Sequence, residues 1–146
     1  MTPEAVFSAA NGVALLGWVA LAAFPRKRWS APLVTGAVVP ALLGLLYAAV
    51  LGSQLGRAHG GFSTLAAVQE LFSNPWLLLA GWVHYLAFDL FIGSWQVREA
   101  LRRGIPHGLV LPCLFLTFML GPVGLLLFLA VRWRRTGRLA VAETAG

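Results

Sequence analysis

Apolar residues dominate four long stretches of this chain, and short polar segments separate them. The stretches cover about residues 5–24, 32–55, 75–97 and 105–131. Each has about the 20 residues that a helix needs to cross the hydrocarbon core of a bilayer, which is about 30 Å thick. The pattern therefore predicts an all-α, polytopic membrane protein with four transmembrane helices and a single domain.

Local residue types indicate where these helices begin and end. Pro25 and the basic residues after it end the first helix, since proline cannot continue the backbone ladder. Asn74 is a good N-cap for the third helix, and Pro75 suits its first position. The fourth helix is about 40 Å long, more than a bilayer needs, so Pro112 and Gly121-Pro122 are expected to kink it. Glu4 and the length of the first run favour a retained helix over a cleaved signal peptide.

The connection between the second and third helices contains an amphipathic segment at residues 62–72. Apolar residues follow helical spacing there, opposite Gln69 and Glu70. A short helix with one apolar face and one polar face is suited to the membrane interface. We expect it to lie on the membrane surface, as a cap on the bundle.

Small residues recur at every fourth position of the second helix. Such a stripe allows the backbone of a neighbouring helix to approach closely. The neighbour could belong to this chain or to a second copy, in a homodimer. The stripe that would form the homodimer contains Gly36, Gly44, Ala48 and Gly52.

Composition supports a membrane protein and argues against nucleic acid as a partner. The chain is 59% hydrophobic and 11% charged, whereas soluble domains are about 45–50% apolar and about 25% charged. The net charge is +6, but the basic residues lie beside apolar runs, where they meet anionic head groups. Abundant Ala, Leu and Arg favour the inner membrane of a bacterium. A single cysteine, Cys113, and three separated histidines lead us to expect no disulfide, metal site or cofactor.

The distribution of charge leaves the orientation of four helices open. The loops near residues 26–28 and 98–103 would share one side with six basic residues, and the other side would hold five. Six against five is no useful bias. It slightly favours the two short loops in the cytoplasm and both termini outside. Dual topology, or a chain that turns back at Gly121-Pro122, also fits.

The candidate chemistry lies in residues 81–95, GWVHYLAFDLFIGSW, in the middle of the third helix. His84 and Asp89 lie close to the expected bilayer midplane, where an ionisable group costs several kcal/mol unless it is paired or hydrated. Tyr85 and Asp89 are four residues apart and can meet on one face. His84 and Phe88 occupy another face, about 140° from Asp89. We therefore expect His84 and Asp89 to have partners on different helices or to reach one cavity from opposite sides.

Three segments of the chain resemble the core of a known family. They are LFSNPWLLLAGWVHYLAFDLF, REALRRGIPH and LPCLFLTFMLGPVGLLLFL, and they lie within the part of the chain that the resemblance covers, about residues 61–129. Their order, and the WxHYxxxD pattern formed by Trp82, His84, Tyr85 and Asp89, resemble the abscisic-acid-deficient-four-like membrane proteins. The plant members are linked to the conversion of violaxanthin to neoxanthin. The resemblance implies an isomerisation that opens an epoxide and forms an allene, with one acid, one base and no redox cofactor.

Three hypotheses for the function remain open. In the first, the protein is an acid–base isomerase of a carotenoid or another isoprenoid lipid. Its catalytic residues would be His84, Asp89 and Tyr85. Its substrate-binding residues would be Trp82, Asn11, Phe88 and Thr117. In the second, the protein binds a carotenoid or lipid, or scaffolds a membrane enzyme, without chemistry. In the third, it is a small proton-linked transporter.

Overall fold

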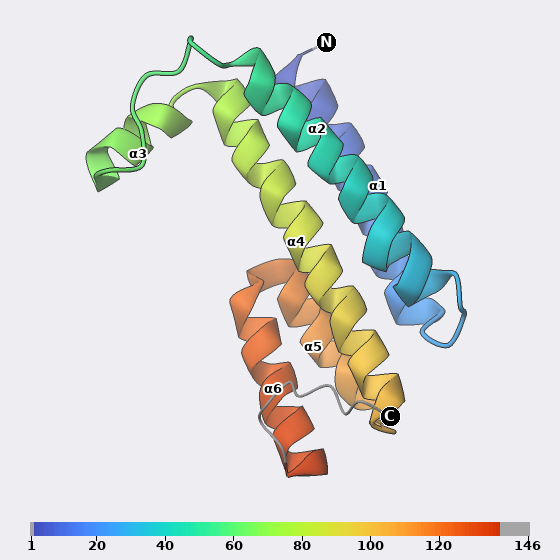
Figure 1. The fold of residues 1–146 in the computed structure, drawn as a ribbon. Coiled ribbons are helices and arrows are strands. Elements are labelled where there is room, and N and C mark those ends of the chain that lie inside the picture. Colours follow the sequence, from blue (N-terminus) through green and yellow to red (C-terminus); the bar gives the residue numbers. More distant parts are fainter. Residues whose placement is uncertain (1, 138–146) are drawn as a thin grey trace, which may run out of the picture.

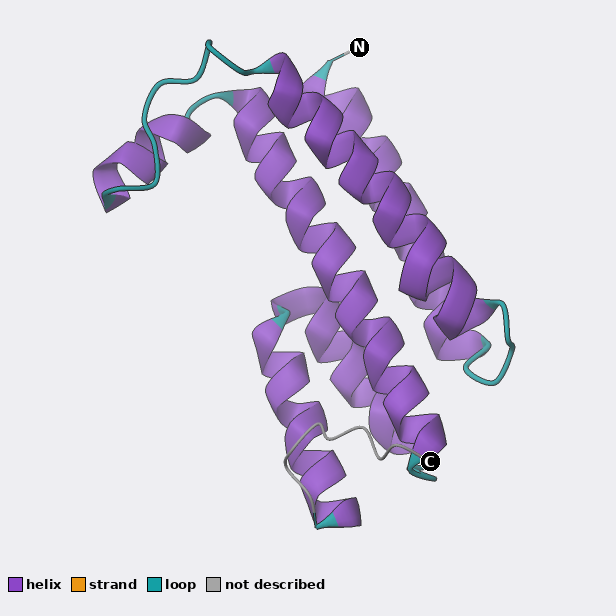
Figure 2. Cartoon of the chain, viewed as in Figure 1, coloured by secondary structure: helices purple, strands orange, loops and turns teal. Residues whose placement is uncertain are grey.

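The chain folds into a bundle of helices around one long central helix (Figures 1 and 2). The computed structural model describes residues 2–137, and no strand occurs among them. In chain order the elements are α1 (Pro3–Ala23), η1 (Ser30–Val38), α2 (Val39–Ser53), α3 (Leu65–Phe72), α4 (Pro75–Arg102), α5 (His107–Leu120) and α6 (Pro122–Thr136). The prediction of an all-α membrane protein is confirmed.

Three helical segments are long and apolar enough to cross a membrane: α1, η1 continued by α2, and α4. The second segment begins with a π-helical stretch, in a region where Pro32 and Pro40 have no backbone N–H to donate. The end of α4 lies at Arg102 and not at the expected residue 97, because Glu99 forms ion pairs with Arg102 and Arg103 one turn further on.

The fourth predicted helix, residues 105–131, is wrong as one continuous element. The structure divides it into α5 and α6, which fold back on each other as a hairpin. Gly121 makes the turn with a φ of 45°, a conformation that residues with a Cβ rarely adopt. Pro122 then begins α6, where a missing N–H costs nothing. Gly124 lies directly against the backbone of Thr117, so the two helices approach closely at the turn.

The hairpin packs on the half of α4 that leads to Arg102 (Figure 1). Helix α5 fills the groove between α1 and α4 there. The Phe118 ring lies edge-on to Trp18 of α1 with ring centres 5.6 Å apart. At the start of α5, a ring nitrogen of His107 lies 2.9 Å from the carbonyl oxygen of Ala22.

Two buried polar clusters hold the hairpin to α4. Gln96 donates a hydrogen bond of 2.9 Å to the Thr117 hydroxyl, and both side chains are fully buried. Near the end of α4, Arg132 of α6 donates to Glu99 at 2.8 Å, with both residues almost completely shielded from solvent. Arg103 completes this second cluster at 3.0 Å from Glu99. Buried charges are tolerated when they are paired and hydrogen-bonded in this way.

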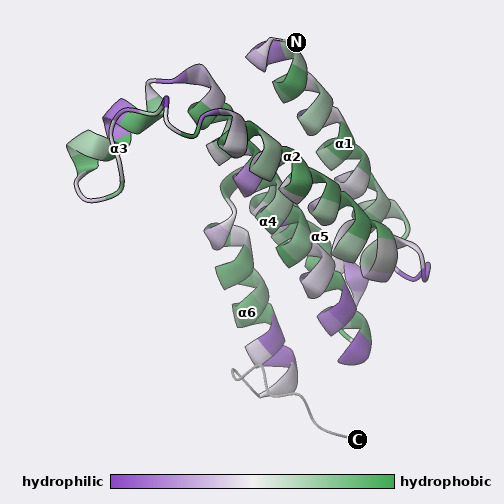
Figure 3. Cartoon of the chain, turned by 45° about the horizontal axis from the view of Figure 1, so that its top comes forward, coloured by the Kyte–Doolittle hydropathy of each residue, from purple (hydrophilic) through white to green (hydrophobic). Residues whose placement is uncertain are grey.

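Helix α3 is the short helix expected between the second and third helices. Its first turn is capped by Thr64, whose hydroxyl accepts a hydrogen bond from the backbone N–H of Ala67, so α3 begins after residue 64 and not at 62. Hydrophilic residues gather at this segment and at helix ends, while the lengths of the long helices are mainly apolar (Figure 3).

The small-residue stripe of the second helix is only partly used inside the chain. Gly36 packs against the Ala31 carbonyl and the Ser94 hydroxyl, whereas Gly44 and Gly52 face open space. The homodimer through this stripe therefore stays a prediction.

Candidate functional site

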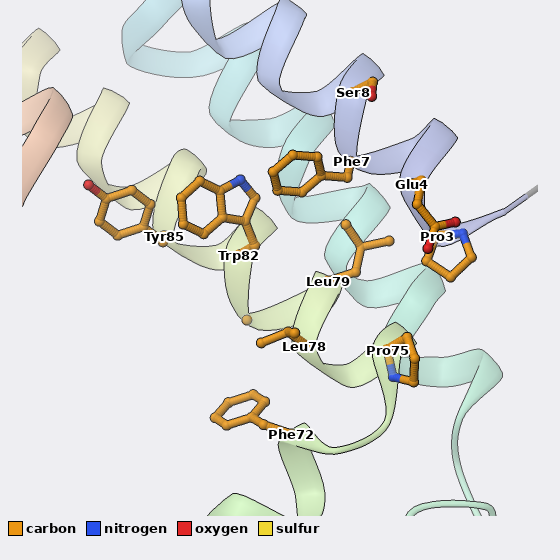
Figure 4. A pocket seen from close by; sticks show the side chains of 11 residues that line it. Pro3, Glu4, Phe7, Ser8, Phe72, Pro75, Leu78, Leu79, Trp82 and Tyr85 are labelled. Atoms are coloured by element: carbon orange, nitrogen blue, oxygen red, sulfur yellow. The ribbon is translucent and has the colours of Figure 1, made fainter.

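An apolar groove lies between the first turns of α1 and α4 (Figure 4). Its volume is about 600 Å³. Glu4 and Phe7 contribute from α1, Phe72 from α3, and Trp82 and Tyr85 from α4. The lining is almost entirely carbon, so the groove suits an apolar ligand with few hydrogen-bonding groups.

The short hairpin explains why the groove is not filled by a helix. Helix α5 fills the space between α1 and α4 only on the side of the bundle that leads to Arg102. The chain turns at Gly121, so the other half of the same space has no helix in it. Phe72 closes one edge by lying against Gly81, where a Cβ would come within 3.0 Å of the phenyl ring. Gly81 therefore allows α3 to border the groove.

Trp82 forms the wall of the groove and is held in place by α1. Its ring centre lies 5.6 Å from that of Phe7 and 5.3 Å from that of Tyr85. Its indole N–H donates a hydrogen bond of 3.2 Å to the Oδ1 of Asn11, whose amide donates to the Phe7 carbonyl at 2.7 Å. Asn11, predicted as a substrate-binding residue, thus orients Trp82 and is not among the groove-lining residues.

Tyr85 forms one end of the groove, and Asp89 lies behind it, beside the hairpin turn. Tyr85 lines the groove, and its hydroxyl donates a hydrogen bond of 3.1 Å to the Phe118 carbonyl. One turn further along α4, the half-buried Asp89 interacts with Tyr85 and faces Gly121. Both carboxylate oxygens would lie 3.0 Å from a Cβ at Gly121. Among the described residues, the buried Oδ2 of Asp89 has no hydrogen-bond partner.

His84 and Phe88 point away from this site. Their rings stack on each other with centres 4.5 Å apart, and the His84 ring lies 5.7 Å from that of Tyr47 on α2. Both side chains are exposed on the surface that the bundle presents to lipid. The structure therefore does not bring His84 and Asp89 together, either directly or across a cavity.

Thr117 also lies outside the groove. Its hydroxyl is fully buried between α4 and α5, where it accepts from Gln96 and donates to the Cys113 carbonyl at 2.8 Å. In this structure Thr117 forms hydrogen bonds to backbone and side-chain groups inside the bundle.

Several residues of the site were missed at the sequence level. Phe7 and Phe72 could not be assigned to a common groove, because they come from elements more than 60 residues apart in the chain. The seven-residue spacing of Glu4, Asn11 and Trp18 indicates from the sequence that they share one face of α1, but it does not indicate that Glu4 lines a groove. In residues 2–137 no group of three or more His, Cys, Asp or Glu residues is placed to hold a metal ion.

Comparison with known proteins provides one match. The sequence model of the ABA DEFICIENT 4-like family matches residues 5–128. Searches of curated proteins and of solved structures returned no match. The matched range includes the groove-lining part of α4, the hairpin turn and Asp89.

Proposed function

Since the chain belongs to the ABA DEFICIENT 4-like family, we propose that it is a membrane enzyme that isomerises an isoprenoid lipid of the carotenoid type. The lipid would lie in the groove between α1 and α4. Tyr85 and Asp89 would provide the proton transfer at the end of that groove. Family membership supports a membrane protein, and the isomerase activity is our proposal.

The observation that carries this proposal is the position of the Tyr85–Asp89 pair. The apolar groove ends at Tyr85, and Asp89 lies behind it with a buried oxygen that no described group satisfies. Buried polar atoms are normally hydrogen-bonded, and an orphaned carboxylate oxygen costs folding free energy. A carboxylate with a purely structural role would be expected to have hydrogen-bond partners for its buried oxygens. The lack of a described partner for the Oδ2 of Asp89 therefore favours a functional role.

The pair has the groups that an isomerisation needs. The phenol of Tyr85 can donate a proton to a ligand oxygen, once its hydroxyl leaves the Phe118 carbonyl. As the epoxide C–O bond breaks, Asp89 can accept the proton that leaves a substrate carbon and pass it to the tyrosinate, so that the pair ends in its starting state. The reaction rearranges bonds within one substrate and has no net gain or loss of protons or electrons. Placing an acid and a base at the end of a binding groove contributes typically 10²–10⁴-fold to rate.

The test uses the purified protein in lipid nanodiscs with a panel of epoxidised carotenoids. Binding is followed by the shift of the polyene absorbance, and products are separated by chromatography. Tyr85→Phe and Asp89→Asn are expected to bind ligand as the parent protein does and to lose turnover. Trp82→Ala, which removes the groove wall, is expected to weaken binding.

His84→Ala is the matched control, because His84 lies on the same helix but on the opposite face. It is expected to keep both binding and turnover. If His84→Ala abolishes turnover and Asp89→Asn leaves it intact, the reaction takes place on the other face of α4 and the groove is not the active site.

A non-catalytic lipid-binding protein is the second candidate. The hydrogen bond from Tyr85 to the Phe118 carbonyl favours it, because that bond joins α4 to the hairpin and gives the phenol a structural role. In that case the ligand binds the groove, is recovered unchanged from every variant, and Tyr85→Phe lowers the melting temperature in detergent.

A further inference from the structure

Both ends of the α5–α6 hairpin lie at the same end of the bundle. The start of α5 meets the end of α1, where His107 lies 2.9 Å from the Ala22 carbonyl. The last turns of α6 meet the end of α4, where Arg132 binds Glu99. Between them, the turn at Gly121 reaches only Asp89, midway along α4 (Figure 1).

Neither helix of the hairpin is long enough to cross the hydrocarbon core of a membrane by itself. Helices α5 and α6 have 14 and 15 residues, which correspond to about 21 and 22 Å, short of the hydrocarbon thickness of about 30 Å. Yet their outer surface is apolar, with Phe115, Leu120 and Leu126 each more than half exposed. Such a surface belongs in lipid and not in water, so a hairpin of this length would enter the bilayer from one side and turn back before the other.

The turn at Gly121 can lie inside the bilayer, because its backbone N–H and C=O groups have hydrogen-bond partners. Gly121 is buried, and its N–H donates to the Thr117 carbonyl at 2.9 Å. Its own carbonyl accepts from Gly124 at 3.1 Å and from Leu125 at 3.3 Å. Backbone that leaves regular helical geometry within the bilayer must have its N–H and C=O groups hydrogen-bonded inside the protein.

A hairpin that returns to its side of origin changes the distribution of charge. If the chain crossed four times, the basic residues would divide almost equally between the two sides. With the hairpin, the end of α6 joins the loop after α1 and the end of α4. Of the ten Lys and Arg residues that the structure describes, this side then holds Arg26, Lys27, Arg28, Arg98, Arg102, Arg103, Arg132, Arg134 and Arg135, and the other side holds Arg57.

We propose that α5–α6 is a re-entrant hairpin and that its basic surface faces the anionic leaflet on the cytoplasmic side. A nine-to-one distribution of basic residues near helix ends determines orientation strongly, whereas six against five does not. The first residue of α1 and the loop with His59 then lie on the opposite side. The groove between α1 and α4, which lies beyond the hairpin turn, opens in that outer half of the bilayer.

Cysteine labelling tests both parts of the proposal in the full chain. Cys113→Ser provides a background without cysteine, and single cysteines are placed at the exposed positions Lys27, His59 and Arg135. Each variant is expressed in a bacterial host and treated with a membrane-impermeant maleimide before and after permeabilisation. We expect His59→Cys to react in spheroplasts, and Lys27→Cys and Arg135→Cys to react only after permeabilisation.

The comparison of positions 27 and 135 decides the hairpin without reference to orientation or to enzyme activity. If they react from opposite sides, α5–α6 crosses the membrane and the re-entrant hairpin is excluded. If they react together from the outside, the hairpin stands and the cytoplasmic assignment is overturned. Cys113→Ser alone should give no label, and a correctly folded variant should elute as the parent protein does in size-exclusion chromatography.

Discussion

The ion pair between Glu99 and Arg132 offers a direct test of what holds the hairpin in place. Glu99 is 2% exposed and Arg132 is 0% exposed, and their side chains meet at 2.8 Å. The substitution Glu99→Gln removes the carboxylate and leaves the guanidinium buried in a site built around a negative charge. Breaking one half of a buried pair costs about 3–5 kcal/mol, here because the buried guanidinium loses its ion pair with Glu99.

This free-energy cost can be converted to a shift in melting temperature. For a chain of this size, 1 kcal/mol corresponds to about 2–4 °C, so Glu99→Gln is expected to lower the apparent melting temperature in detergent by about 10 °C. The matched control is Arg102→Gln, which breaks a pair whose arginine side chain is 58% exposed. An exposed pair contributes at most about 1 kcal/mol, so this control should melt within about 3 °C of the parent protein.

Two further measurements separate a loss of the pair from a general loss of stability. Cys113 is fully buried on α5, so release of the hairpin should speed its reaction with a small maleimide in Glu99→Gln and not in Arg102→Gln. The double substitution Glu99→Met with Arg132→Met removes both buried charges but leaves Arg103 without Glu99, so it should recover part of the lost stability. The reasoning is refuted if Glu99→Gln and Arg102→Gln melt within about 2 °C of each other, given the costs above.

Three other substitutions test the site and the hairpin turn. Gly121→Ala places a Cβ at a φ of 45° and within 3.0 Å of the carboxylate it faces, so it should lower stability by at least 1–2 kcal/mol, measured by thermal unfolding in detergent. Thr117→Val keeps the shape of the side chain but removes the hydroxyl that accepts a hydrogen bond from Gln96. The free energy of unfolding is expected to fall by about 1–3 kcal/mol in the same assay. An unchanged melting curve would contradict the buried hydrogen bond. Asn11→Ala frees the Trp82 indole and should weaken carotenoid affinity without removing turnover at saturating ligand, as an absorbance titration would show.

Periodicity and composition were sufficient to predict the membrane class and the apolar helical segments, but they did not establish the break that divides residues 105–131 into α5 and α6. A span of about 20 apolar residues has a favourable free energy of transfer wherever its neighbours are. The common face of Trp82, Tyr85 and Asp89 was also predictable, since positions three and four apart on a helix always share a side. In the same way, the i,i+3 and i,i+4 pattern around Glu99 is visible in the sequence alone.

The sequence alone determined the apolar helical segments, the membrane setting and which residues share a face of α4, because these depend on residue type and on contacts within one or two turns. Only the tertiary structure decided that the chain turns back at Gly121, that Arg132 meets Glu99, and that Asn11 supports Trp82. The last two contacts join residues 33 and 71 positions apart, so they depend on how whole helices pack. Hydropathy records that a residue prefers to be buried, but it does not specify which helix will cover it.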